Sequence, residues 1–177
     1  MPPAGTRPTS DRVRESMFSS LDSELGTWVG LRVIDLYAGS GALGLEARSR
    51  GADHVLLVES DRRAVDVCRA NVAAVGLDAV SVLTADVERL VAVAPPVQAR
   101  PPYDLVLADP PYDLAAARLA EVLAALVDGG WVAPGAVVVV ERSAREDPFP
   151  WPAGIEALRH RRYGETALWY GRHQSTG

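Results

Sequence analysis

The chain of 177 residues is 48% hydrophobic and 23% charged, which is the composition of a globular protein and excludes a disordered one. Its length predicts a single domain over residues 1–177, with residues 1–26 as an N-terminal arm and helix, and leaves no room for a second catalytic domain. The formal charge of -5 argues against a protein that coats long nucleic acid, and the lack of a membrane-spanning run or signal peptide predicts a cytoplasmic location.

The first predicted element is a helix that Ser10 caps and that ends at Gly26. Its apolar face consists of Val13, Met17, Leu21 and Leu25. A face of this kind is buried in globular proteins, so we expect the helix to pack on the sheet that follows.

From Leu31 onward, short β-branched runs alternate with helical patterns, which is typical of a parallel sheet covered on both faces. The predicted strands are 32–36, 55–59, 80–84, 103–108 and 136–141. The predicted helices are 42–50, 62–75, 87–93 and 115–127, and 155–163 with 167–170 forms a terminal hairpin around Gly164. The expected fold is a doubly wound, mostly parallel α/β sheet with a C-terminal antiparallel hairpin, which binds ligands beyond the carboxyl ends of its strands.

A glycine-rich turn follows the first predicted strand and matches the G-x-G-x-x-G pattern. In a nicotinamide enzyme such a turn binds pyrophosphate, whereas in a methyltransferase it leaves room for the methionine part of S-adenosylmethionine. The carboxylate of Asp35 at the strand end supplies negative charge for that cationic group. The predicted cofactor-binding residues of this segment are Asp35, Tyr37, Ala38, Gly39, Ser40 and Gly41.

Acidic residues also end the second and third predicted strands. Glu59, followed by Ser60, is placed to accept hydrogen bonds from ribose hydroxyls. Asp86 is placed to accept from an adenine amino group, while Val87 packs on the ring. For Asp86 a helix N-cap is an equally good interpretation.

The fourth predicted strand ends in the tetrapeptide Asp109, Pro110, Pro111 and Tyr112, which is the predicted catalytic segment. An amino group on a base is a poor nucleophile, and the Asp109 carboxylate with the Pro110 carbonyl can accept its N–H hydrogen bonds. Two prolines contribute no competing N–H donors, and Tyr112 can stack on the base. Asp109 also borders the predicted cofactor site. The structural alternative is a Pro-Pro turn capped by Asp113 ahead of a helix.

With these motifs, the sequence resembles a known family, the bacterial 16S ribosomal RNA guanine-N2 methyltransferases of the RsmD type. The resemblance runs from about Gly5 to Arg172 and is carried by residues 6–15, 35–41, 109–112 and, more loosely, 163–166. It implies the Rossmann-like class I methyltransferase fold and S-adenosylmethionine as cofactor. It also implies methylation of the N2 amine of guanine 966 of 16S rRNA in an assembling 30S subunit. The segments 35–41 and 109–112 also occur in DNA adenine and protein glutamine methyltransferases.

Two arginine clusters are candidates for contact with RNA. Their members are Arg7, Arg12 and Arg14 near the N-terminus and Arg159, Arg161 and Arg162 in the predicted hairpin. A solvated helix face explains the first cluster equally well. We expect no metal, because histidine and cysteine do not cluster, no membrane contact, and a monomer.

Three alternatives stay open. A nicotinamide oxidoreductase explains the glycine turn but gives the tetrapeptide no role. A DNA adenine or cytosine amino methyltransferase shares the tetrapeptide but needs a target-recognition region for which the chain has little room. An RNA-binding ribosome assembly factor without activity is the alternative from another class, against which Asp109 argues.

Overall fold

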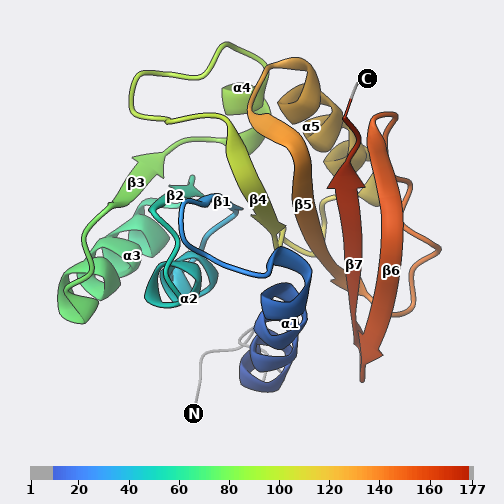
Figure 1. Cartoon of the computed structure of the whole chain (residues 1–177), viewed down its shortest axis with the longest axis horizontal. Helices are drawn as coiled ribbons and strands as arrows, with labels where there is room; N and C mark the ends of the chain where they lie inside the picture. The colour runs from blue at the N-terminus through green and yellow to red at the C-terminus, as the bar shows by residue number, and fades with distance from the viewer. Residues whose placement is uncertain (1–9, 176–177) are drawn as a thin grey trace.

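The computed structural model describes residues 10–175, which form one seven-stranded sheet with helices on both faces (Figure 1). The helices are α1 (Ser10–Leu25), α2 (Ala42–Ser49), α3 (Arg62–Val75), α4 (Val87–Val91) and α5 (Ala116–Asp128). The strands are β1 (Arg32–Leu36), β2 (His54–Glu59), β3 (Val80–Thr84), β4 (Tyr103–Ala108), β5 (Val132–Ser143), β6 (Ile155–Tyr163) and β7 (Thr166–His173). This is the predicted doubly wound sheet with a C-terminal antiparallel hairpin.

The strand order β3-β2-β1-β4-β5-β7-β6 creates a topological switch point between β1 and β4. The chain moves outward from β1 to β3 and then returns to place β4 on the other side of β1. Strands β1 to β5 are parallel, and β7 pairs antiparallel with both β5 and β6. Loops that leave β1 and β4 in opposite directions open a crevice at this point, which is where open α/β sheets bind ligands.

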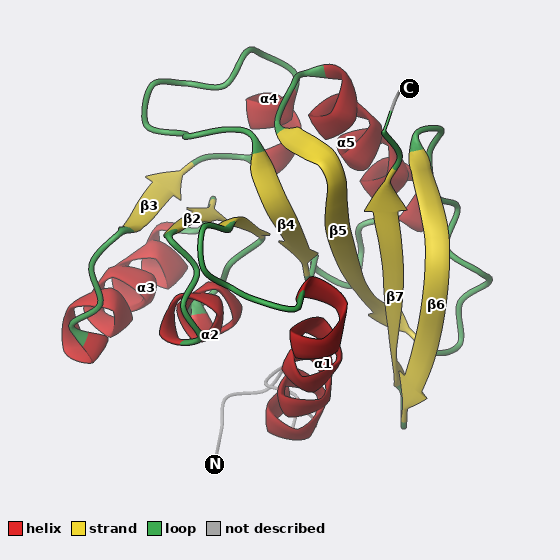
Figure 2. Cartoon of the chain, viewed as in Figure 1, coloured by secondary structure: helices red, strands yellow, loops and turns green. Residues whose placement is uncertain are grey.

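Two separate apolar cores lie on the two faces of the sheet. On one face, α1, α2 and α3 bury residues such as Met17, Phe18 and Cys68 against the strands. On the other face, α4 and α5 bury residues such as Val91 and Leu123 (Figure 2). Successive strand residues point to opposite faces, so central strands that are covered twice are apolar throughout.

The structure corrects the predicted start of the fifth strand. Strand β5 begins at Val132 rather than at residue 136, because Pro134-Gly135, typical of a turn, falls within a register shift of the ladder between β4 and β5. In α3, the buried face consists of Val65 and Cys68 with Val72 packed beside them, whereas Val67 and Val75 are exposed.

The terminal hairpin separates the arginines that the sequence groups together. Arg159, Arg161 and Tyr163 face α1, whereas His160 stacks on Trp169 with ring centroids 4.4 Å apart. Trp169 packs against the core on the α5 face, so alternation places Arg162 on that face as well. The run 159–162 is therefore two half-patches on opposite faces of the sheet.

Candidate active site

The glycine-rich turn is built around Asp35, whose side chain is 1% exposed at the end of β1. Its Oδ2 accepts a hydrogen bond from the backbone N–H of Gly44 at 3.0 Å, which ties the first turn of α2 to β1. Gly44 has no room for a side chain, since an added Cβ would lie 2.2 Å from Leu57 Cδ2. Burial, and then the charges of Asp109 and Glu59, raises the pKa of Asp35 to about 8 although the Gly44 hydrogen bond lowers it.

Glu59 organises the backbone around the crevice. Its Oε1 accepts a hydrogen bond from the N–H of Gly39 at 2.8 Å, and its Oε2 accepts from Ser60 at 2.8 Å and Asp61 at 2.9 Å. A carboxylate has about four acceptor positions, so three backbone donors leave room for a ligand hydroxyl. Glu59 therefore holds the glycine turn in addition to any ligand that it binds.

Two cavities meet at the switch point, and Tyr37, Asp109 and Pro111 line both of them. The first, of about 450 Å³, is lined by Tyr37, Glu59, Ser60, Asp86, Val87, Glu88, Asp109, Pro111, Asp113 and Leu114. The second, of about 510 Å³, is lined by Val13, Arg14, Met17, Asp35, Tyr37, Ala38, Gly39, Ser40, Ala42, Leu43, Asp109, Pro110, Pro111, Tyr112 and Glu141. The structure thus brings the predicted cofactor and catalytic segments to one crevice.

Tyr37 forms the divide between the cavities. Its φ of 58° is left-handed, a conformation that costs free energy for a residue with a side chain and that collects at functional sites. Its hydroxyl is buried without a hydrogen-bond partner, and burial raises the pKa of that phenol well above its ordinary value. Buried polar atoms without a partner are rare in folded proteins, so this hydroxyl marks an unusual local arrangement at the divide.

Asp86 combines the two roles that the sequence offers. Its Oδ1 caps α4 by accepting from the N–H of Arg89 at 3.0 Å, which confirms the N-cap interpretation. The residue also lines the cavity that Glu59 and Val87 share. Asp86 can therefore cap α4 and line the cavity at the same time.

The tetrapeptide begins directly after β4, next to β1 at the switch point. Pro110 is buried, while Tyr112 is 68% exposed at the mouth of the second cavity. The N-cap of α5 is Ala115, which makes no side-chain cap hydrogen bond, so the alternative of a turn capped by Asp113 is wrong. The motif forms a short turn in which Leu114 donates to the Pro111 carbonyl at 3.1 Å.

Glu141 was not predicted as a site residue, yet it lies near the end of β5 and lines the same cavity as Asp109 and Tyr112. The signal was present, because acidic residues also mark the ends of β1 and β2. Glu141 is also the last residue of the predicted strand 136–141, so the same reasoning from acidic strand ends applies to it.

Cys68 lies beneath the glycine turn and is fully buried. An added Cβ on Gly41, whose φ is 84°, would lie 2.8 Å from its sulfur. Burial, followed by the charges of Asp35 and Glu59, raises the pKa of the thiol to about 11. The thiol is therefore protonated at neutral pH, which is unsuited to nucleophilic catalysis.

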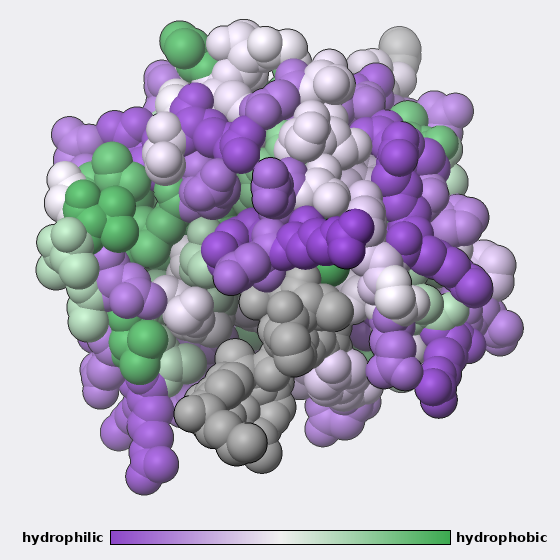
Figure 3. All heavy atoms as spheres, turned by 90° about the horizontal axis from the view of Figure 1, so that it is seen from below, coloured by the Kyte–Doolittle hydropathy of each residue, from purple (hydrophilic) through white to green (hydrophobic). Residues whose placement is uncertain are grey.

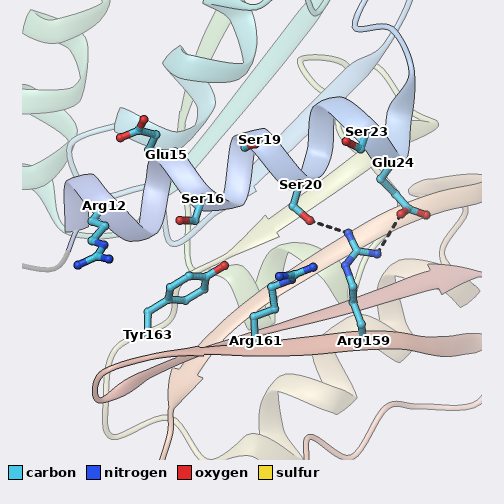
Figure 4. A pocket seen from close by; sticks show the side chains of 10 residues that line it. All are labelled: Arg12, Glu15, Ser16, Ser19, Ser20, Ser23, Glu24, Arg159, Arg161 and Tyr163. Atoms are coloured by element: carbon cyan, nitrogen blue, oxygen red, sulfur yellow. Dashed lines mark hydrogen bonds and ion pairs between the residues drawn. The ribbon is translucent and has the colours of Figure 1, made fainter.

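A separate polar groove of about 740 Å³ runs between α1 and β6 (Figure 4). It is lined by Arg12, Glu15, Ser16, Ser19, Ser20, Ser23, Glu24, Arg159, Arg161 and Tyr163. One end is closed by Arg159, which donates to Glu24 at 2.9 Å and to Ser20 at 2.7 Å and whose guanidinium lies 4.4 Å from the centre of the Tyr170 ring. Arg161 and Arg12 are exposed.

The remaining predicted arginines differ in position. Arg14 pairs with Asp11 at 2.8 Å and lines the cavity that contains the tetrapeptide. Arg162 lies on the opposite face of the sheet, and Arg7 lies outside the described residues.

Figure 3 views the molecule from below, the side toward which β4 and β6 run, and hydrophilic side chains cover much of the described part of that face.

Within residues 10–175 no group of three or more histidine, cysteine, aspartate or glutamate side chains is placed to hold a metal ion. In the same part of the chain no helix has both the length and the apolar composition needed to cross a membrane.

The sheet order, the glycine turn at the switch point and the acidic strand ends define a Rossmann-like domain of the class I methyltransferase type. The chain belongs to the family whose model is described as "Conserved hypothetical protein 95", and this model matches residues 1–172. Its similarity to ribosomal RNA small subunit methyltransferase D supports the same family.

Similarity to individual proteins supports the same family. The chain is 32% identical over 163 residues to ribosomal RNA small subunit methyltransferase D of Escherichia coli, covering 92% of this chain and 77% of the relative. A solved structure named putative methyltransferase yhhF, from Escherichia coli, aligns with a TM-score of 0.83 and 32% identity over 98% of this chain and 91% of that chain. A putative methylase from Haemophilus influenzae aligns with a TM-score of 0.76 and 26% identity over 95% of this chain and 100% of that chain.

Proposed function

We propose that this protein transfers a methyl group from S-adenosylmethionine to the exocyclic N2 amine of guanine 966 in 16S rRNA during assembly of the small subunit. The observation that carries the proposal is the position of the Asp109 to Tyr112 turn. It lies where the two cavities of the switch point meet, beside the glycine turn and the acidic strand ends. The name of the Escherichia coli relative supports ribosomal RNA as the substrate.

The residues of the crevice fit S-adenosylmethionine. Glu59 and Asp86 line the first cavity with acceptors for hydroxyl and amino groups, and Val87 offers an apolar surface for an adenine ring. Asp35 and the glycine turn line the second cavity, whose acidic character suits a cationic amino acid. When bound, the cofactor supplies an activated methyl group on a positively charged sulfur.

The protein residues act on the target amine. The Asp109 carboxylate and the Pro110 carbonyl accept its two N–H hydrogen bonds and thereby orient the nitrogen lone pair. Tyr112, exposed at the cavity mouth, stacks on the base. Such positioning lowers the activation barrier without prior removal of a proton, and Asp109 can accept the proton that the methylated amine releases.

The RNA backbone has basic side chains beside this site. Arg14 lines the catalytic cavity, and Arg12 and Arg161 line the groove between α1 and β6. We assign these three arginines to phosphate contacts, because guanidinium groups bind phosphate in a forked geometry. We further propose that the protein acts as a monomer, in the cytoplasm, on an assembling 30S subunit.

The test is methyl transfer from labelled cofactor to small subunits of a strain that lacks the enzyme, with mapping of the modified base. The parental protein should methylate guanine 966. Asp109→Ala should keep its melting temperature and cofactor affinity but lose single-turnover methyl transfer by roughly 10²–10⁴-fold, the effect of removing a positioned proton-handling group. Label on another base would contradict the substrate assignment, and a parental rate in Asp109→Ala would contradict the catalytic one.

A DNA adenine or cytosine amino methyltransferase uses the same tetrapeptide. The described residues form one sheet and its covering helices, with no further module beside the crevice to read DNA sequence. Incubation of the same protein with mixed-sequence duplex DNA under the conditions of the RNA assay should give no incorporated label.

A further inference from the structure

Glu141 lies next to Asp109 where the β4–β5 ladder ends. Ala108, the last residue of β4, pairs with Val140 of β5, so Asp109, directly after β4, and Glu141 of β5 both follow this last pair. Neighbouring strands are about 4.8 Å apart, which places the two backbones within reach of a single planar base.

The two acidic residues also line the same space. Glu141 follows Val137 and Val139 at a spacing of two, and both valines belong to the core on the α1 face. The cavity that Glu141 lines contains Met17 of α1 together with Asp109 and Tyr112. Glu141 is half-buried there, so a hydrogen bond from a ligand to the Glu141 carboxylate would be shielded from bulk water.

The Watson–Crick edge of guanine requires an additional acceptor of this kind. Its N1–H and its N2 amine are adjacent donors, whereas the corresponding N1 of adenine is an acceptor. If Asp109 and the Pro110 carbonyl hold the amine, the N1–H beside it still needs an acceptor, because a buried unsatisfied donor is costly. A carboxylate at that position favours guanine and repels a base whose N1 carries a lone pair.

We propose that Glu141 accepts the N1–H of the target base and is the residue that selects guanine at this site. The inference rests on the proposed function, because it concerns the base that the Asp109 segment methylates. Glu141 acts on specificity through a hydrogen bond to the base, and Asp109 and Pro110 remain the residues that orient the amine.

The test uses small subunits reconstituted with 16S rRNA that carries either guanine or 2-aminopurine at the target position. 2-Aminopurine keeps the exocyclic amine but has a bare N1 acceptor. The parental protein should methylate guanine about 10- to 100-fold faster than 2-aminopurine under single turnover at saturating cofactor. In Glu141→Gln this ratio should fall to within about threefold of one, because an amide can present either its oxygen or its N–H to N1.

Calorimetry distinguishes base selection from a contact with the cofactor. Glu141→Gln should bind S-adenosylhomocysteine like the parental protein, and the matched control Glu121→Gln, on the exposed side of α5, should keep the parental base ratio. A parental ratio in Glu141→Gln, with or without weaker cofactor binding, would overturn the inference. Failure of the parental protein to methylate guanine would overturn the proposed function itself.

Discussion

At the scale of single residues, Asp35 shows how a buried acid can report on cofactor binding. Its pKa of about 8 lies above the value of 3.8 for an exposed carboxyl group, chiefly because of burial. The folded chain therefore holds this proton at pH values where the unfolded chain has lost it. The stabilising contribution of Asp35 is complete below pH 4 and is lost as the pH rises through about 8.

We expect binding of the cationic cofactor to release this proton. Affinity for S-adenosylmethionine should increase as the pH is raised from 6 to about 8 and then level off, because ionised Asp35 attracts the cation. Calorimetry in buffers of different ionisation enthalpy measures the proton release. Asp35→Asn should bind more weakly and without this pH dependence, and a parental protein whose affinity does not change over this range would contradict the assignment of Asp35.

At the scale of elements, successive residues of β6 point to opposite faces of the sheet, so Arg161 and Arg162 offer a matched pair of positions for substitution. Arg161 lines the groove on the α1 face, in the same row of the sheet as Glu141 and three interstrand spacings, or roughly 14 Å, from the end of β4. Arg162 is one position further along and faces the opposite side. RNA that reaches the catalytic cavity along α1 passes the first arginine and not the second.

Arg161→Ala should therefore weaken RNA binding and reduce the slope of log affinity against log salt by about one, the effect of losing one phosphate contact. Arg162→Ala should leave both quantities near the parental values. Fluorescence anisotropy with an RNA fragment around the target at several salt concentrations provides the measurement. Equal effects of the two variants would show that RNA binding does not depend on the α1 face.

The ion pairs of Glu24 join α1 to the hairpin, and their effect on stability can be compared with that of the exposed pair of Glu165. Glu24 accepts from Arg159 at 2.9 Å and from Arg172 at 2.5 Å in a half-buried position. Glu24→Ala should lower the free energy of unfolding by about 1 kcal/mol, because two partly shielded guanidinium groups lose their partner. Glu165→Ala, which breaks an exposed pair with Arg145, should change it little, and urea titration that shows equal losses would contradict this difference.

At the scale of the whole molecule, local patterns predicted the sheet well because each strand and helix carries its own periodicity. The bounds of β1, β3 and β4 agree with the sequence prediction, and the glycine turn and tetrapeptide lie in one crevice because parallel strands end at one edge. Contacts that depend on strand pairing could not be predicted. Glu141 acquires its place beside Asp109 only through the ladder of β4 and β5, and Arg159 acquires its partners only when α1 lies over β6.

The packing of α1 also sets an order of events during synthesis. Residues 10–25 leave the ribosome long before residues 166–173, yet α1 buries Met17 and Phe18 in a core that includes Leu168 and Tyr170 of β7. Contacts that distant in sequence form late in folding. Because Val13 and Met17 also line the catalytic cavity, the wall that α1 gives to this cavity is fixed only after β7 has been translated. A nascent chain thus holds the residues of its glycine turn long before it can complete the catalytic cavity.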